Sequence, residues 1–131
     1  MFPANTRILI LDDMSTMRKV VTKTLKEIGF TDIQEAADGN LGWDVLQASN
    51  PPVQLVISDW NMPNCSGLDL LKRVRADARF KKLPFVLLTA EAEASQVKEA
   101  LLSGVSNYIV KPFTADVIKM KLEQAHKKVA A

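Results

Sequence analysis

Short apolar segments alternate along this chain with longer segments whose apolar residues recur at helical spacing. Five segments are predicted as strands because they are short, rich in apolar residues and bounded by polar or turn-forming residues: 7–13, 32–36, 53–58, 83–89 and 106–110. A helical stripe follows each of them, at 17–28, 41–46, 68–75, 95–103 and 118–129. Strands that alternate with helices predict parallel βαβ units with right-handed crossovers. We therefore expect a doubly wound α/β fold, a parallel sheet between two layers of helices.

Residues that favour turns mark the expected ends of several elements. Gly29 and Gly104 follow two of the helical stripes, where a helix often ends in a left-handed residue. Ser66 and Asp69 resemble a capping box at the start of the third helix. The segment 32–36 is more polar than the other strands, which predicts a position at the edge of the sheet.

Composition narrows the class of protein. The 131 residues suffice for one domain with a buried core, and no linker-like segment divides them, so we expect a single domain over 1–131. A net charge of +2 gives no argument for binding nucleic acid or a membrane surface. No apolar run approaches the roughly 18 residues of a membrane span, and the N-terminus lacks a signal-peptide core. The single cysteine, Cys65, suits a reducing cytoplasm.

Polar side chains stand at the carboxyl ends of four predicted strands. Asp12 and Asp13 end the first strand, and Asp59 follows the third. Thr89 ends the fourth, and Lys111 follows the fifth. Sites in open parallel sheets form beyond these ends, where the winding reverses. The strand order 2-1-3-4-5 is adopted from known five-stranded sheets, because the sequence alone leaves the order open; it makes strands one and three neighbours, so that the three carboxylates meet.

Three adjacent carboxylates predict a bound cation or a proton. Two unit charges about 4 Å apart repel by on the order of 4 kcal/mol at an effective dielectric constant near 20. Oxygen ligands in a small cluster suit Mg²⁺, which keeps open positions for a phosphoryl oxygen. A carboxylate can also be the nucleophile in phosphoryl transfer. Asp59 is the best candidate for that role, whereas Asp12 and Asp13 would hold the metal, and Thr89 and Lys111 would contact the phosphoryl group.

Each of these residues has an ordinary structural explanation when it is taken alone. An Asp at a strand end is most often a helix cap or a solvated loop residue, and a Lys-Pro pair is usually a turn. A single Thr after a strand indicates nothing. The prediction of a functional site depends on the joint occurrence of the five residues at the ends of strands one, three, four and five.

The same residues carry a resemblance to a known family. Asp12-Asp13, Asp59, Thr89 and Lys111-Pro112 resemble the motif of the receiver domains of two-component response regulators. The stretches DDMSTMRKV, SDWNMPN, LLTAEAE and YIVKPF are similar to CheY-like single-domain chemotaxis regulators, and the resemblance covers about residues 6–128. It implies a flavodoxin-like (βα)5 three-layer sandwich without an output domain. It also implies a cytoplasmic signalling protein and not an enzyme that turns over a separate substrate.

The resemblance implies a role for each matching residue of the site. Asp59 would accept a phosphoryl group from a histidine kinase. Asp13 and Asp59 would bind Mg²⁺ through their side chains, Asn61 through its backbone carbonyl, and Asp12 through water. Thr89 would bind the phosphoryl group together with Lys111, whose peptide bond to the following proline would be cis.

The resemblance also implies a switch and a partner surface. Tyr108 would move inward as Thr89 closes on the phosphoryl group. The fourth helix, fifth strand and fifth helix would then bind a flagellar motor switch protein, through a partner face of Glu93, Val97, Tyr108 and Lys121. The expected protein is a monomer, and a phosphatase is a further candidate partner.

Two departures from the family leave alternatives open. Ser66 stands where CheY-like sequences commonly have an Asp, and Glu93-Ala94 stand where motor-binding members carry basic residues. A single-domain receiver that acts as a phosphate sink or relay shuttle is therefore an alternative. A phosphatase of the haloacid dehalogenase type would carry its second acid two residues after a nucleophile on strand one, whereas Asp12 and Asp13 are adjacent. A flavin-binding module is disfavoured because this acid pair would repel the flavin phosphate.

Four further side chains have simpler expectations. Trp60 should flank the site and report its occupancy by fluorescence, and Trp43 should lie in the core. Cys65 is expected to be a loop thiol without a function, and His126 a surface residue.

Overall fold

The computed structural model describes residues 1–90 and 94–130. Its strands are β1 (Arg7–Leu11), β2 (Asp32–Ala36), β3 (Leu55–Asp59), β4 (Phe85–Thr89) and β5 (Asn107–Val110). Its helices are α1 (Ser15–Ile28), α2 (Gly39–Ala48), α3 (Gly67–Ala76), α4 (Ala94–Leu102) and α5 (Ala115–Ala130). The predicted type and order of the elements are confirmed. Several bounds differ by a few residues: the first strand ends at Leu11, which leaves both following acids in a loop, and the third begins at Leu55 and includes Asp59.

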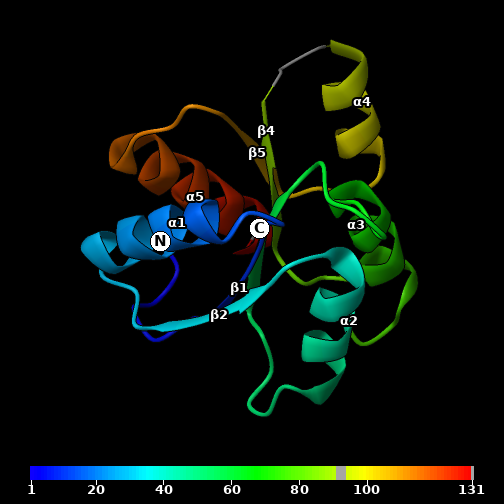
Figure 1. Cartoon of the computed structure of the whole chain (residues 1–131), viewed down its shortest axis with the longest axis horizontal. Coiled ribbons are helices and arrows are strands. Elements are labelled where there is room, and N and C mark those ends of the chain that lie inside the picture. The colour runs from blue at the N-terminus through cyan, green and yellow to red at the C-terminus, as the bar shows by residue number, and fades with distance from the viewer. Residues whose placement is uncertain (91–93, 131) are drawn as a thin grey trace.

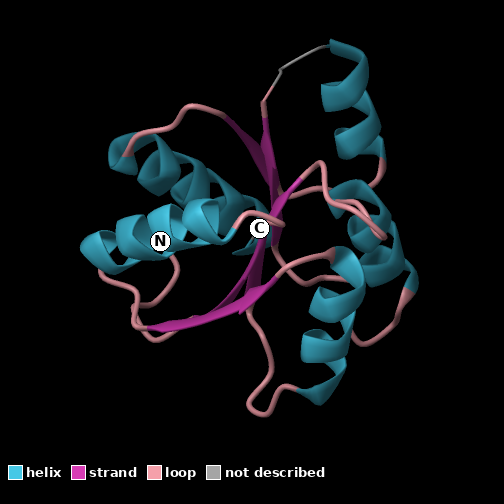
Figure 2. Cartoon of the chain, in the orientation of Figure 1, coloured by secondary structure: helices cyan, strands magenta, loops and turns pink. Residues whose placement is uncertain are grey.

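The strands form one parallel sheet in the order β2-β1-β3-β4-β5. Helices α1 and α5 cover one face of this sheet, and α2, α3 and α4 cover the other (Figures 1 and 2). The doubly wound three-layer sandwich and the adopted strand order are therefore confirmed. Because β1 and β3 are neighbours and all strands run the same way, their carboxyl ends meet at one edge of the sheet.

Two hydrophobic cores hold the helices on the sheet. Alternate residues of β1 point to opposite faces, so Leu9 and Leu11 pack into the core below α2 and α3, and Ile8 and Ile10 into the core below α1 and α5. All four side chains are fully buried. The segment 32–36 is only partly buried and forms the edge strand β2, as its polar sequence predicted.

The predicted helix ends are also confirmed. Gly29 has a φ of 124° and caps α1, and Gly104 has a φ of 91° just after α4. Ser66 is the N-cap of α3, where its hydroxyl oxygen accepts a hydrogen bond of 3.1 Å from the backbone N–H of Asp69. The peptide bond between Lys111 and proline is cis, as expected, and so is the bond between Asn50 and Pro51.

The structure refines three single-residue expectations. Trp43 is only partly buried at the border of the core, where its ring contacts Phe80 at 5.7 Å between centroids. Cys65 lies in the loop between β3 and α3, as expected, and is buried against the start of α2. His126 is half-buried, because its ring packs edge-on against Phe2 at 4.8 Å between centroids. Within the described ranges, no helix is long and apolar enough to cross a membrane.

Candidate functional site

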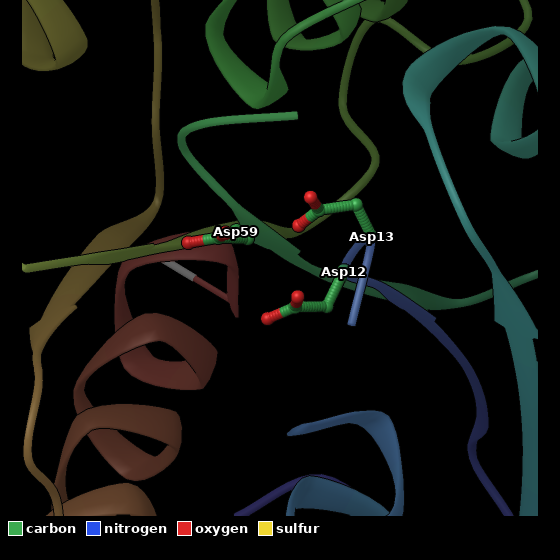
Figure 3. A group of neighbouring side chains, drawn as sticks. All are labelled: Asp12, Asp13 and Asp59. Atoms are coloured by element: carbon green, nitrogen blue, oxygen red, sulfur yellow. The ribbon is translucent and has the colours of Figure 1, made fainter. Parts of the chain in front are cut away.

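Three carboxylates converge at the carboxyl end of the sheet. Asp12 and Asp13 follow β1, and Asp59 is the last residue of the neighbouring strand β3. One carboxylate oxygen of each lies within 4.8 Å of those of the other two, and Figure 3 shows the side chains together. The predicted meeting of these three acids is therefore observed, because the parallel pairing of β1 with β3 places both strand ends at the same level.

Asp59 is held in one orientation by its neighbours. The residue is 9% exposed, and its Oδ1 accepts hydrogen bonds of 3.0 Å from the backbone N–H of Trp60 and 3.0 Å from Nζ of Lys111. Burial raises the pKa of the Asp59 carboxyl above its ordinary value. The hydrogen bond and charge of Lys111 lower this pKa, whereas the negative charge of Asp12 raises it further. The side chain is thus oriented in a shielded but charged environment.

Lys111 supplies the positive charge within the cluster. Its Nζ lies 3.0 Å from Asp59 Oδ1 and 3.5 Å from Asp12 Oδ2. The residue follows β5, and its backbone N–H donates to the carbonyl of Thr89 at 2.8 Å, which joins the ends of β4 and β5. Among the described residues, one ammonium group then faces three carboxylates, which leaves the cluster with net negative charge when all are ionised.

The surroundings of Asp12 suit a further cation. Its Oδ1 accepts a hydrogen bond of 2.9 Å from the backbone N–H of Met14, at the start of α1. Its Oδ2 is buried and has no hydrogen-bond partner among the described residues, with only the charge of Lys111 at 3.5 Å. A buried oxygen of this kind is costly unless a cation or water satisfies it. The donor set is made only of oxygen atoms, as Mg²⁺ prefers, so the residues present fit that ion.

The loop after β3 is folded closely against Asp59. Gly67 donates its backbone N–H to the carbonyl of Trp60 at 2.9 Å. A Cβ atom at this position would overlap the backbone carbonyl oxygen of Asp59, so the start of α3 requires a glycine here. The same carbonyl accepts a hydrogen bond of 2.9 Å from the hydroxyl of Ser58. Asn61 is exposed in this loop, two residues after Asp59, and its predicted role as a backbone ligand stays a prediction.

Two further side chains, those of Arg18 and Asp38, hold the loops around the cluster, and sequence reasoning missed both. Arg18 on α1 donates to the backbone carbonyl of Asp12 at 2.6 Å and to the carboxylate of Glu35 at 3.1 Å. Asp38, the N-cap of α2, accepts a hydrogen bond of 3.1 Å from the side chain of Asn64 in the loop after β3. An arginine in the first turn of a helix and an Asp at a helix start occur in many proteins. The sequence therefore gave little reason to expect that Arg18 and Asp38 contact these loops.

The other predicted site residues that the structure describes lie on β4, α4, β5 and α5. Thr89 ends β4 and is 5% exposed. Tyr108 lies half-buried on β5, with Nζ of Lys121 4.8 Å from its ring centroid. Val97 is half-buried on α4, and Glu93 falls outside the described residues. The structure thus places Tyr108 and Lys121 in contact, whereas the predicted roles of these residues in switching and partner binding stay predictions.

Comparison with known proteins agrees with this geometry. Residues 8–123 match the family model of the response regulator receiver domain. The chain is 48% identical over 117 residues to chemotaxis protein CheY1 of Helicobacter pylori, covering 89% of this chain and 94% of the relative. It is 46% identical over 123 residues to chemotaxis protein CheY of Pseudomonas aeruginosa, covering 94% and 98%. The solved structure of chemotaxis response regulator CheY4 of Vibrio cholerae is 29% identical, with a TM-score of 0.83 and coverage of 92% and 98%. The chain belongs to the response regulator receiver domain family.

Proposed function

We propose that this protein is a phosphorylation-activated response regulator of chemotaxis that receives a phosphoryl group from a histidine kinase on Asp59. The observation that carries the proposal is the cluster of Asp12, Asp13 and Asp59 within 4.8 Å, with Nζ of Lys111 3.0 Å from Asp59. The family match over residues 8–123 and the relatives named as chemotaxis proteins support the same function. The proposal includes a monomeric protein in the cytoplasm, formed by one receiver domain.

The proposed reaction moves a phosphoryl group from nitrogen to oxygen. A carboxylate oxygen of Asp59 attacks the phosphorus of a phosphohistidine, the P–N bond breaks as the O–P bond forms, and the imidazole leaves and takes up a proton. Trp60 N–H and Lys111 keep Asp59 oriented for this attack, which provides much of the catalysis in phosphoryl transfer. Lys111 is also close enough to bind a phosphoryl oxygen.

Mg²⁺ would supply charge neutralisation at this site when it is bound. Asp12, Asp13, Asp59 and the backbone carbonyl of Asn61 would hold it, directly or through water. The buried Oδ2 of Asp12, which accepts no hydrogen bond from the described residues, supports this assignment. Without a cation, the three carboxylates would repel the negatively charged phosphoryl group.

Switching would begin at Thr89. A phosphoryl group adds roughly 1.5 to 2 negative charges and strong hydrogen-bond acceptors. Thr89 stands at the end of β4, the neighbour of β3, and can turn its hydroxyl toward such a group. Tyr108 on the adjacent strand β5 would then move inward and change the outer surface.

The proposed output surface comprises α4, β5 and α5. It carries Val97, Tyr108 and Lys121 and the exposed apolar side chains Leu102 on α4 (79% exposed) and Met120 on α5 (47% exposed). Exposed apolar groups on elements that also carry an aromatic and a cation are consistent with a protein-binding surface. The proposed partner is a flagellar motor switch protein, with a phosphatase as a further partner.

A binding experiment tests the proposal. A fluorescent N-terminal peptide of the flagellar switch protein is titrated with and without Mg²⁺ and beryllofluoride, which mimics the aspartyl-phosphate. Trp60 fluorescence reports occupancy, because this residue follows Asp59 directly. Tighter peptide binding on occupancy supports both the switch and the motor output. In parallel, Asp59→Asn should abolish labelling by a small phosphodonor, and labelling that persists would place the acceptor elsewhere.

One sequence observation favours a second output. Glu93-Ala94 stand on the proposed partner face where the resemblance to motor-binding members would lead us to expect basic residues. Occupancy without tighter peptide binding would therefore support a phosphate sink or a relay shuttle that uses the same receiver chemistry. A haloacid dehalogenase-like phosphatase is less favoured, since the receiver family model matches most of the chain.

A further inference from the structure

A hollow that is partly open to solvent lies at the amino end of the sheet, opposite the acidic cluster. Its volume is about 630 Å³, within the range of small-molecule sites. The walls are formed by α2, the segment that leads into β3 and the loop that leads into β4. Leu46, Val53, Leu83 and the partly buried ring of Phe80 provide apolar surface. This cavity has no part in the proposed phosphoryl transfer, because Asp59 stands at the other end of β3.

The rim of this cavity is positively charged. Arg79, Lys81 and Lys82 line it, and within the described part of the chain no acidic side chain does so. Arg79 is neutralised by Asp77, at 2.8 Å between Nη2 and Oδ2, and its guanidinium covers the ring of Phe80. Lys81 and Lys82 are exposed and form no ion pair with any described residue. Two unpaired ammonium groups therefore border an apolar cavity.

A second hollow adjoins the first at the same two lysines. Its volume is about 330 Å³, and Lys81, Lys82, Arg75 and Lys128 line it without any acidic residue among the described residues. Arg75 is committed to the fold, because it donates to the carbonyls of Gly104 at 2.8 Å and Leu83 at 2.6 Å. Lys128 contacts a backbone carbonyl at 3.2 Å. The pair Lys81-Lys82 thus stands between an apolar hollow and a cationic one.

The two lysines are not explained by neutralisation of a helix end. Lys128 lies in the last turn of α5, where the helix dipole favours a cation. Lys81 and Lys82 lie in the loop beyond α3, which ends at Ala76, and the dipole effect falls off within one turn. Their position suits an external anion, and the adjoining apolar walls suit a flat apolar group attached to it.

We propose that these two hollows form a second ligand site, which binds a phosphorylated compound with a flat apolar group, such as a nucleoside triphosphate. The base would enter the hollow between Leu46, Val53 and Phe80, and the phosphates would lie on Lys81 and Lys82. Tight binding would need both halves of the ligand, because the apolar walls would hold the base and the adjacent lysines would hold the phosphates. The site is independent of Asp59 and of the receiver chemistry.

The test is an NMR titration of the ¹⁵N-labelled protein with ATP, adenosine and tripolyphosphate in EDTA. Chelation removes metal from the acidic cluster, which then repels phosphates. ATP should shift the amides of the loop 79–83 and the indole signal of Trp43, whose ring contacts Phe80. It should bind at least about tenfold more tightly than adenosine or tripolyphosphate, because each of these fills only one half of the site.

Matched variants separate a site from general charge attraction. Lys81→Ala combined with Lys82→Ala should weaken ATP binding about tenfold or more, as expected for lost charge-assisted hydrogen bonds. Lys19→Ala combined with Lys23→Ala removes the same charge from exposed positions of α1 and should change the affinity less than about twofold. Gln47→Glu adds a negative charge at the exposed wall of the cavity and should also weaken binding.

Four results would overturn the proposal. Equal affinities for ATP and tripolyphosphate would show attraction by charge alone, and so would equal losses in the two double-lysine variants. Shifts confined to residues around Asp12 and Asp59, or no shifts at all, would show that these hollows bind no such ligand. Binding that is unchanged in Asp59→Asn supports the independence of the site, so the receiver function and this site can fail separately.

Discussion

The contact between Lys111 and Asp59 allows a quantitative test of the site. The two charged atoms are 3.0 Å apart, and their side chains are 21% and 13% exposed. Coulomb attraction at that distance is on the order of 5 kcal/mol for an effective dielectric constant near 20. Solvent reaches both groups and reduces this value, so we expect a coupling free energy of about 2 kcal/mol.

The measurement is a double-mutant cycle on the free energy of unfolding. Lys111→Met keeps the apolar stem and removes the charge, whereas Asp59→Asn keeps the shape of the carboxylate. Urea unfolding at neutral pH in EDTA gives the stability of both single variants, the double variant and the parent. Lys111→Met should be strongly destabilising in the parent, because it leaves buried carboxylates without their cation, and much less so beside Asp59→Asn. Lys119→Met, at an exposed position of α5, is the control and should cost little.

The pH dependence gives a second readout of the same contact. Burial raises the pKa of Asp59 above the value of 3.8 that applies to the unfolded chain, and Lys111 opposes this rise. The folded protein therefore binds the Asp59 proton more tightly than the unfolded chain does. The contribution of Asp59 to the free energy of unfolding falls as pH rises from about 3.8 through the raised pKa. Lys111→Met removes the opposing effect and should enlarge this fall.

Two results would refute the reasoning. A coupling free energy below about 0.5 kcal/mol would mean that solvent screens the pair as it screens an ordinary surface ion pair. A fall with pH that is no larger in Lys111→Met than in the parent would mean that Lys111 does not hold the pKa of Asp59 down.

Three further predictions concern the metal, the loop after β3 and the switch. Excess Mg²⁺ should raise the free energy of unfolding of the parent by about 2.7 kcal/mol at 100 times the dissociation constant. Urea unfolding of Asp13→Asn should show that most of this gain is lost. A gain in the variant equal to that of the parent would mean that Asp13 does not bind the metal. Gly67→Ala should cost about 1–3 kcal/mol and slow phosphorylation, because the added methyl overlaps the Asp59 carbonyl; urea unfolding and phosphodonor labelling measure both, and parent-like values would contradict the packing argument. Tyr108→Ala should be labelled at the parent rate yet lose phosphorylation-dependent binding of the switch peptide; peptide binding that survives intact would exclude Tyr108 as the gate.

Much of the fold could be predicted because its signals are local. The spacing of apolar residues in 17–28 and the apolar run 83–89 are patterns among neighbours in sequence. The structure has a helix at the first segment and a strand at the second. Helix ends were readable for the same reason, as at Gly29, where a positive φ favours glycine. The strand order was adopted from known sheets, since pairing between strands depends on contacts distant in the chain.

The candidate site was partly predictable because a parallel sheet gathers all its strand ends at one edge. Asp12, Asp59 and Lys111 are far apart in sequence, yet the alternation of elements alone indicates that they share that edge. The packing around them was not predictable. Gly67 looks like an ordinary glycine near a helix start, and only the folded loop shows that a larger residue would overlap Asp59.

The sequence by itself therefore determined the elements, their alternation and the chemical types at the strand ends. These properties follow from periodicity and from the residues at each break in it. The tertiary structure alone decided which atoms touch, including the contact between Lys111 and Asp59, the buried Asp12 oxygen without a hydrogen bond from the described residues, and the cavity beside Lys81. Distances and hollows arise when segments remote in sequence pack together, and no local pattern encodes the few ångströms that separate a contact from a gap.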